Sequence, residues 1–240
     1  MKTIQLFLLA ITALSGCAKK TETLTQFKPD TTVVNNKPMK SGPFTYLALG
    51  DSYTIGQSVP QNQSYPYQLK TLLNNDALNV LAPDIIAVTG WTTDNLINAI
   101  DQSSFKDKKY DFVTLLIGVN DQYQQLSKDN YRTKFAQVLK TAIAFANGNV
   151  DRVFVISIPD WGVTPFAGGQ NAIIGPDIDA FNAINLDETR KAHVTYADIT
   201  AISRQAANDR SLIADDGLHP SGKMYAEWMA LLEPMVIKEF

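Results

Sequence analysis

The sequence has 240 residues, 45% of them hydrophobic and 19% charged, which is typical of a globular domain with a substantial core. A formal net charge of −3 leaves no basic surplus to neutralise phosphates, which argues against nucleic-acid binding and against a polybasic membrane patch. The single cysteine excludes a disulfide within the chain, and about 200 residues after the leader suffice for one domain without a structural metal.

The N-terminal segment has the order of an export signal. A basic start at Lys2 precedes an apolar run from Ile4 to Leu14, and small residues then lead to Cys17. The run of about eleven residues is too short to span a bilayer. The position of the cysteine resembles the lipobox of bacterial lipoproteins, in which that cysteine is lipidated. An ordinary cleaved signal peptide with an incidental cysteine is the alternative.

We therefore expect residues 1–17 to be a lipoprotein signal peptide and Cys17 to be the lipidation site. The product would be an exported bacterial lipoprotein, anchored to a membrane and facing the periplasm or the cell exterior, in the outer membrane if the cell has two. Residues 18–43 are rich in lysine, threonine, asparagine and proline and poor in large apolar groups, which predicts a flexible linker. The catalytic or binding domain would then span residues 44–240.

From Phe44 onward, apolar runs of strand length alternate with segments of helical periodicity, which predicts parallel strands joined by helices. The expected strands are Phe44–Leu49, Asp84–Val88, Phe112–Ile117, Val153–Ile158 and Val194–Ile199. The clearest helix covers residues 128–147, and weaker ones cover 64–78, 92–101, 177–191 and 222–239, the last kinked or divided by Pro234. We expect an α/β fold, a three-layer α/β/α sandwich around a five-stranded parallel sheet. Its ligand site would lie beyond the carboxyl ends of the strands.

A serine follows the first predicted strand directly. In Gly50-Asp51-Ser52-Tyr53 the chain turns from strand to helix, and Ser52 would stand at the carboxyl edge of the sheet. The serine could serve only as a helix cap. The same turn also suits a nucleophile, because backbone N–H groups at the start of a helix face any negative charge that develops there.

A nucleophilic serine needs a base, and the sequence has two histidines. His193 opens a predicted strand and has the context of an ordinary surface residue, whereas His219 lies in a polar loop before the last helix. Asp216 stands three residues before His219, a spacing that lets a carboxylate accept the imidazole Nδ1–H and leave Nε2 free. Asp215 is the alternative partner, and a loop that merely contains turn-forming residues is the alternative for the segment.

Two residues after other predicted strands have the chemistry of oxyanion donors. Gly90, after the second strand, can expose its N–H because no side chain blocks the approach, and Asn120, after the third, offers a side-chain amide. Taken singly, the glycine would be a turn residue and the asparagine a cap.

Together these motifs resemble the conserved blocks of GDSL (SGNH) hydrolases, in the family's order and over most of residues 44–240. Gly50-Asp51-Ser52 resembles block I, Gly90 block II, Gly118-x-Asn120-Asp121 block III, and Asp216-x-x-His219-Pro220 block V. The departure is Tyr53, where the family name expects leucine. The resemblance implies a flavodoxin-like fold with Ser52 as nucleophile, His219 as base and Asp216 as its orienting partner. It also implies an oxyanion hole built from Ser52, Gly90 and Asn120.

The expected activity is hydrolysis of carboxylic esters of short to medium acyl chains through an acyl-enzyme, with lysophospholipids or acetylated carbohydrates as candidate substrates. No cofactor or metal is required. Candidate pocket residues are Tyr53, Ile55, Trp91, Trp161 and Phe166, the last two from a glycine-rich and aromatic loop after the fourth strand. Two alternatives remain: an acyltransferase that uses the same three residues, and a glycan-binding lipoprotein without chemistry.

Overall fold

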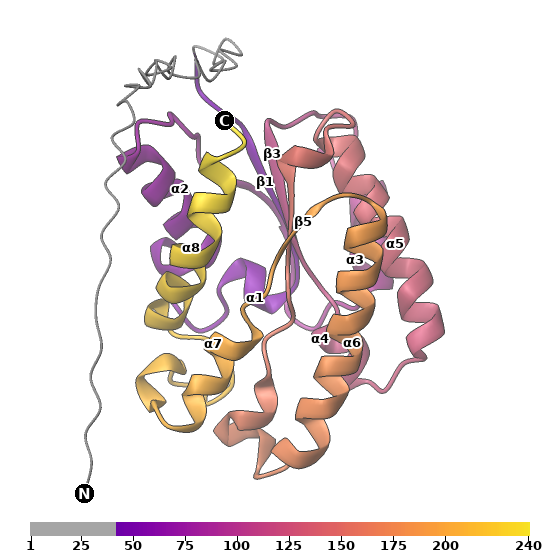
Figure 1. Ribbon diagram of the computed structural model, residues 1–240, viewed down its shortest axis with the longest axis vertical. Helices are drawn as coiled ribbons and strands as arrows, with labels where there is room; N and C mark the ends of the chain where they lie inside the picture. Colours follow the sequence, from indigo (N-terminus) through magenta and orange to yellow (C-terminus); the bar gives the residue numbers. More distant parts are fainter. Residues whose placement is uncertain (1–41) are drawn as a thin grey trace, which may run out of the picture. The chain divides into compact units, whose positions relative to one another are not determined.

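Five parallel strands form a single sheet in the computed structural model, which describes residues 42–240 (Figure 1). The strands are β1 (Tyr46–Gly50), β2 (Asp84–Ala87), β3 (Phe112–Leu116), β4 (Val153–Ile156) and β5 (Thr195–Ala197). Their order across the sheet is β2-β1-β3-β4-β5, and every neighbouring pair is parallel. All residues of β1, β3 and β4 are buried, as their continuous apolar sequences predict for strands covered on both faces.

Helices cover both faces of this sheet. Figure 1 shows α2 (Tyr65–Asn75) and α8 (Gly222–Ile237) on one face, and α3 (Thr93–Gln102), α5 (Lys128–Phe145) and α6 (Asn171–Lys191) on the other. Shorter helices α1 (Ser52–Ile55), α4 (Val119–Tyr123) and α7 (Thr200–Arg204) lie in the connections. The predicted three-layer α/β/α sandwich is therefore confirmed.

The predicted helices differ from the observed ones at two prolines. Helix α6 begins at Asn171 rather than at residue 177 and contains Pro176; the preceding Gly175 has no Cβ for the proline ring to meet. Helix α8 is not divided at Pro234 but continues to Ile237; the proline removes only its own N–H from the helical hydrogen bonds. The loop expected after β4 is ordered into two 3₁₀ turns, Trp161–Val163 and Pro165–Ala167.

The connection after β1 defines where a ligand can bind. The chain passes from β1 to β2 on one side and returns to β3 on the other, so the strand order reverses at β1. Ligands of open α/β sheets bind outside the carboxyl ends of the strands at such a reversal. Gly50 ends β1 there, and a Cβ on it would lie 2.1 Å from Thr54 Oγ1 and 2.3 Å from the carbonyl oxygen of Leu116. The tight turn into α1 therefore requires glycine at this position.

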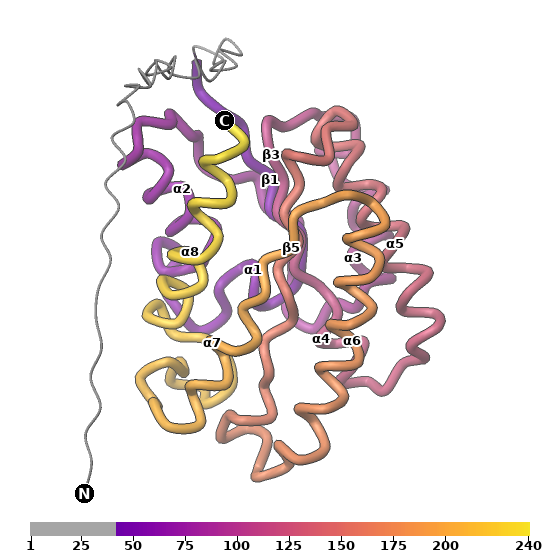
Figure 2. Tube along the Cα trace, in the orientation of Figure 1, coloured from indigo at the N-terminus to yellow at the C-terminus, as the bar shows by residue number. Residues whose placement is uncertain are grey.

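Two segments far apart in the sequence close this end of the sheet. Figure 2 shows the connection from β4 to α6 beside the segment between α7 and α8. The Phe166 N–H donates to the carbonyl oxygen of Gly217 over 3.0 Å and joins the two segments. The predicted signal peptide, Cys17 and nearly all of the predicted linker lie outside the described residues. Within residues 42–240, no helix has the length and apolar character needed to cross a bilayer.

Candidate active site

A cavity of about 160 Å³ lies at the carboxyl end of the sheet, beside β1 and β3. It brings together four polar positions that the sequence separates widely: Ser52, Gly90, Asn120 and His219. Four aromatic side chains also line it: Tyr53, Tyr123, Trp161 and Phe166. The cavity therefore joins a cluster of polar groups to an aromatic rim.

Ser52 is the first residue of α1, so its N–H has no partner within the helix. Its side chain is 4% exposed and borders the cavity. Asp51 caps the helix: its Oδ1 accepts the Tyr53 N–H at 3.0 Å. No direct hydrogen bond joins Ser52 Oγ to His219 within residues 42–240, although both residues line the cavity.

The carboxyl group of Asp51 is buried directly behind the serine. Its Oδ2 has no hydrogen-bond partner among the described residues, and the side chain is fully inaccessible to solvent. Burial, with a further contribution from the charge of Asp121, raises the pKa of Asp51 to about 8. Asp51 is therefore largely protonated at neutral pH and places little negative charge next to Ser52.

His219 is held by Asp216, and Asp215 is not its partner. The His219 Nδ1 and Asp216 Oδ2 atoms are 2.6 Å apart, while Asp216 Oδ1 accepts the backbone N–H groups of Leu218 and His219, each at 2.9 Å. A neutral imidazole that donates from Nδ1 carries its lone pair on Nε2, which has no partner among the described residues. The tyrosine after the nucleophile packs edge-on against the imidazole, with the Tyr53 and His219 ring centroids 5.6 Å apart.

A residue that the sequence reasoning missed also contacts Asp216. Ser58 Oγ donates to Asp216 Oδ2 over 2.6 Å, and Ser58 has a φ of 67°, a conformation uncommon for residues other than glycine. Burial alone would raise the pKa of Asp216, but the hydrogen bonds from Ser58, His219 and Leu218 outweigh it and hold that pKa well below the ordinary value. Asp216 therefore stays ionised. Ser58 lies 158 positions away in the chain, so no local motif could have indicated it.

Gly90 follows β2 and Asn120 follows β3, and both line the cavity. Gly90 has a φ of 83°, which favours glycine, and its N–H has no acceptor among the described residues. Asn120 Nδ2 donates one hydrogen to the Trp91 carbonyl oxygen at 2.9 Å, which orients the amide and leaves its second hydrogen available. The neighbouring Asp121 accepts from the Thr93 N–H and Oγ1, tying α4 to α3.

Three of the five expected pocket residues, Tyr53, Trp161 and Phe166, line the cavity, and Ile55 and Trp91 do not. Ile55 lies about 4.5 Å further along the axis of α1 than Ser52, at the end of that single turn. Trp91 is partly buried and packs against the hydrophobic core. The sequence reasoning missed Tyr123, Val119, Thr89 and Leu218 as lining residues. No group of three or more potential metal ligands occurs within residues 42–240.

Several solved structures have a similar fold. TesA aligns with a TM-score of 0.64 at 16% identity, covering 82% of this chain and 99% of that one. The acetylxylan esterase Axe2 from Geobacillus stearothermophilus aligns with a TM-score of 0.60 at 16% identity, covering 82% and 93%. Phospholipase A1 from Streptomyces albidoflavus NA297 aligns with a TM-score of 0.59 at 19% identity, covering 83% and 100%. The chain thus shares its fold with these three proteins.

The sequence itself matches the GDSL-like lipase/acylhydrolase family over residues 48–227, which is most of the described chain. The protein belongs to this family and is a hydrolase that acts on ester bonds. No curated protein matches the sequence.

Proposed function

We propose that the protein is a serine esterase that hydrolyses carboxylic esters of short to medium acyl chains, with Ser52, His219 and Asp216 as its catalytic triad. The observation that carries this proposal is the placement of Ser52 and His219 on one cavity, with His219 Nδ1 bound to an ionised Asp216 at 2.6 Å. That arrangement supplies a hydroxyl, a base and the partner that orients the base.

In the first half of the reaction, His219 Nε2 takes the proton of Ser52 as Oγ attacks the acyl carbonyl. The negative charge that develops on the carbonyl oxygen is bound by the N–H groups of Ser52 and Gly90 and by the free hydrogen of Asn120 Nδ2. His219 then returns the proton to the departing alcohol, and the acyl group stays on Ser52. In the second half, His219 takes a proton from water as the water oxygen attacks the acyl carbonyl. The bond to Ser52 Oγ then breaks, His219 returns the proton to Oγ, and the carboxylic acid leaves.

The size of the cavity supports a short to medium acyl group. Its volume of about 160 Å³ is well below the roughly 300–1,000 Å³ usual for drug-sized ligands, and its rim is aromatic. The leaving group is not decided by the similar proteins, because one is named an acetylxylan esterase and another a phospholipase A1.

The test is hydrolysis of p-nitrophenyl esters from acetate to palmitate by the purified protein and by Ser52→Ala. We expect turnover that is highest for short chains and lost in the variant, together with labelling of Ser52 by a fluorophosphonate. Unchanged hydrolysis by Ser52→Ala would refute the assignment. A binding protein without chemistry would hydrolyse none of the esters, and an acyltransferase would form less free acid when an acceptor alcohol is added.

We also propose that the protein is exported and anchored to a membrane through a lipid on Cys17. The support lies in the sequence, where Cys17 ends a short apolar run that follows Lys2. Radiolabelled palmitate should be incorporated by the wild-type chain expressed in a bacterium and not by Cys17→Ser, which should also leave the membrane fraction. Equal incorporation in both would exclude Cys17 as the anchor.

A further inference from the structure

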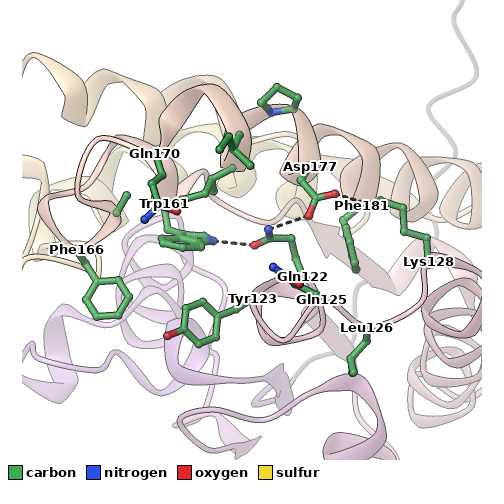
Figure 3. A pocket seen from close by; sticks show the side chains of 14 residues that line it. Gln122, Tyr123, Gln125, Leu126, Lys128, Trp161, Phe166, Gln170, Asp177 and Phe181 are labelled. Atoms are coloured by element: carbon green, nitrogen blue, oxygen red, sulfur yellow. Dashed lines mark hydrogen bonds and ion pairs between the residues drawn. The ribbon is translucent and has the colours of Figure 1, made fainter.

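A second, larger hollow runs alongside the cavity. It has a volume of about 980 Å³, at the upper end of the range for small-molecule sites, and is bounded by α4, the turns after β4 and the first half of α6. Three of its side chains, Tyr123, Trp161 and Phe166, also line the cavity at Ser52 (Figure 3). We call this hollow the outer groove. A molecule whose acyl group lies at Ser52 would therefore extend past the aromatic rim into the outer groove.

The aromatic wall of the outer groove is held in place from behind. Trp161 Nε1 donates to Gln122 Oε1 at 2.8 Å, and Gln122 Nε2 donates to Asp177 Oδ2 at 2.9 Å, as the dashed lines of Figure 3 show. The ring centroid of Trp161 lies 5.5 Å from that of Tyr123 and 6.0 Å from that of Phe166. Tyr123 and Phe166 are about half exposed, at 54% and 53%. Their faces are thus available to a ligand without rearrangement.

The side chains that line the outer groove carry no net charge. Lys128 Nζ is ion-paired with Asp177 Oδ1, so the charges of the two ionic side chains that line the groove cancel. The side-chain amides of Gln125 and Gln170 face the same groove and have no hydrogen-bond partner among the described residues. Each offers two donors and an acceptor oxygen to a ligand.

Aromatic side chains, zero net charge and free amides together favour some leaving alcohols of an ester over others. A phosphate-bearing headgroup needs uncompensated cations, and the lysine of the groove is already paired. A long hydrocarbon chain would cover the glutamine amides and deprive them of water without offering them hydrogen bonds. A sugar ring presents C–H groups on its face, which pack on aromatic rings, and hydroxyls on its edge, which both donate and accept.

We propose that the outer groove is the leaving-group site of the enzyme and that it accepts a neutral carbohydrate, so that the substrate is an acylated oligosaccharide. This inference rests on the proposed esterase function. The acyl group occupies the cavity at Ser52, one sugar ring stacks on the wall formed by Tyr123, Trp161 and Phe166, and Gln125 and Gln170 bind sugar hydroxyls.

The experiment compares three substrates: partly acetylated xylo-oligosaccharides, p-nitrophenyl acetate and lysophosphatidylcholine. The double variant Gln125→Ala/Gln170→Ala removes both free amides at exposed positions, and Gln137→Ala, exposed on α5 and away from the groove, is the matched control. We expect the ratio of kcat/KM for the oligosaccharides to that for p-nitrophenyl acetate to fall about tenfold in the double variant, mainly through KM, and to be unchanged in the control.

The outcomes separate this inference from the proposed function. If the wild-type enzyme hydrolyses p-nitrophenyl acetate and the double variant keeps the wild-type ratio, the carbohydrate site is overturned and the esterase function stands. Preference of the wild-type enzyme for lysophosphatidylcholine over the oligosaccharides would overturn it in the same way. Absence of turnover on all three substrates would instead refute the esterase function itself.

Discussion

Replacing Ser58 by alanine removes one of the four hydrogen bonds that reach the Asp216 carboxylate and leaves the other three in place. A hydrogen bond to a charged group contributes about 1.5–3 kcal/mol, and the exposure of Ser58 to water reduces this to about 1 kcal/mol. Under the proposed mechanism Asp216 stabilises the His219 imidazolium, which forms only during reaction, so the loss should fall on kcat. We expect kcat to decrease about fivefold with little change in KM.

The measurement is steady-state hydrolysis of a p-nitrophenyl ester by the wild-type protein, Ser58→Ala and Ser58→Gly. Glycine suits the positive φ at this position, so Ser58→Gly should unfold at no lower temperature than Ser58→Ala while losing kcat to the same degree. Ser211→Ala is the matched control, because Ser211 Oγ is also exposed and donates to an aspartate, Asp209, at 2.6 Å. It should keep the wild-type kcat.

Two results would refute this reasoning. A wild-type kcat in both Ser58 variants would mean that the hydroxyl contributes nothing to the orientation of Asp216. A wild-type kcat in Ser58→Gly alone would mean that backbone strain at residue 58, rather than loss of the hydrogen bond, causes the lower kcat of Ser58→Ala.

Two further predictions concern the surroundings of Ser52. Asn120→Ala should lower kcat about 100- to 1,000-fold in p-nitrophenyl ester hydrolysis, because it removes a donor that acts mainly on the transition state; a loss confined to KM would contradict this role. Asp51→Asn should alter how the free energy of unfolding depends on pH. The folded chain keeps the Asp51 proton up to about pH 8, whereas the unfolded chain loses it near pH 4, so wild-type stability falls as the pH rises between these values. Urea titrations at pH 5 and pH 8.5 should show a smaller fall in the variant, by an amount on the order of a few kcal/mol, and equal falls would show that Asp51 is ionised in the folded protein.

The secondary structure was largely predictable from the sequence because its signals are local. The apolar runs that became β1, β3 and β4 needed only their own residues to be recognised, since both faces of those strands are buried. The predicted helix boundary at residue 177 was wrong, because α6 begins at Asn171. In the structure Gly175 lets α6 pass through Pro176.

The candidate site was only partly predictable, because motif spacing says which residues follow a strand and not which way they face. Trp91 and Ile55 have the apolar side chains expected of pocket residues, yet neither lines the cavity. The roles of the triad and of the oxyanion donors stay predictions until the variants are measured. The spacing favoured Asp216 over Asp215, and in the structure Asp216 Oδ2 lies 2.6 Å from His219 Nδ1.

The chain alone determined the parallel α/β architecture, the family and the small set of residues that carry the proposed chemistry, because periodicity and short motifs are properties of neighbouring residues. Tertiary structure decided the rest. Three features depend on side chains that come together only when distant segments pack. They are the contact of Ser58 with Asp216, the burial of the Asp51 carboxyl and the outer groove. Sequence periodicity does not predict these long-range contacts, because their energies come from burial and from hydrogen bonds formed across the fold.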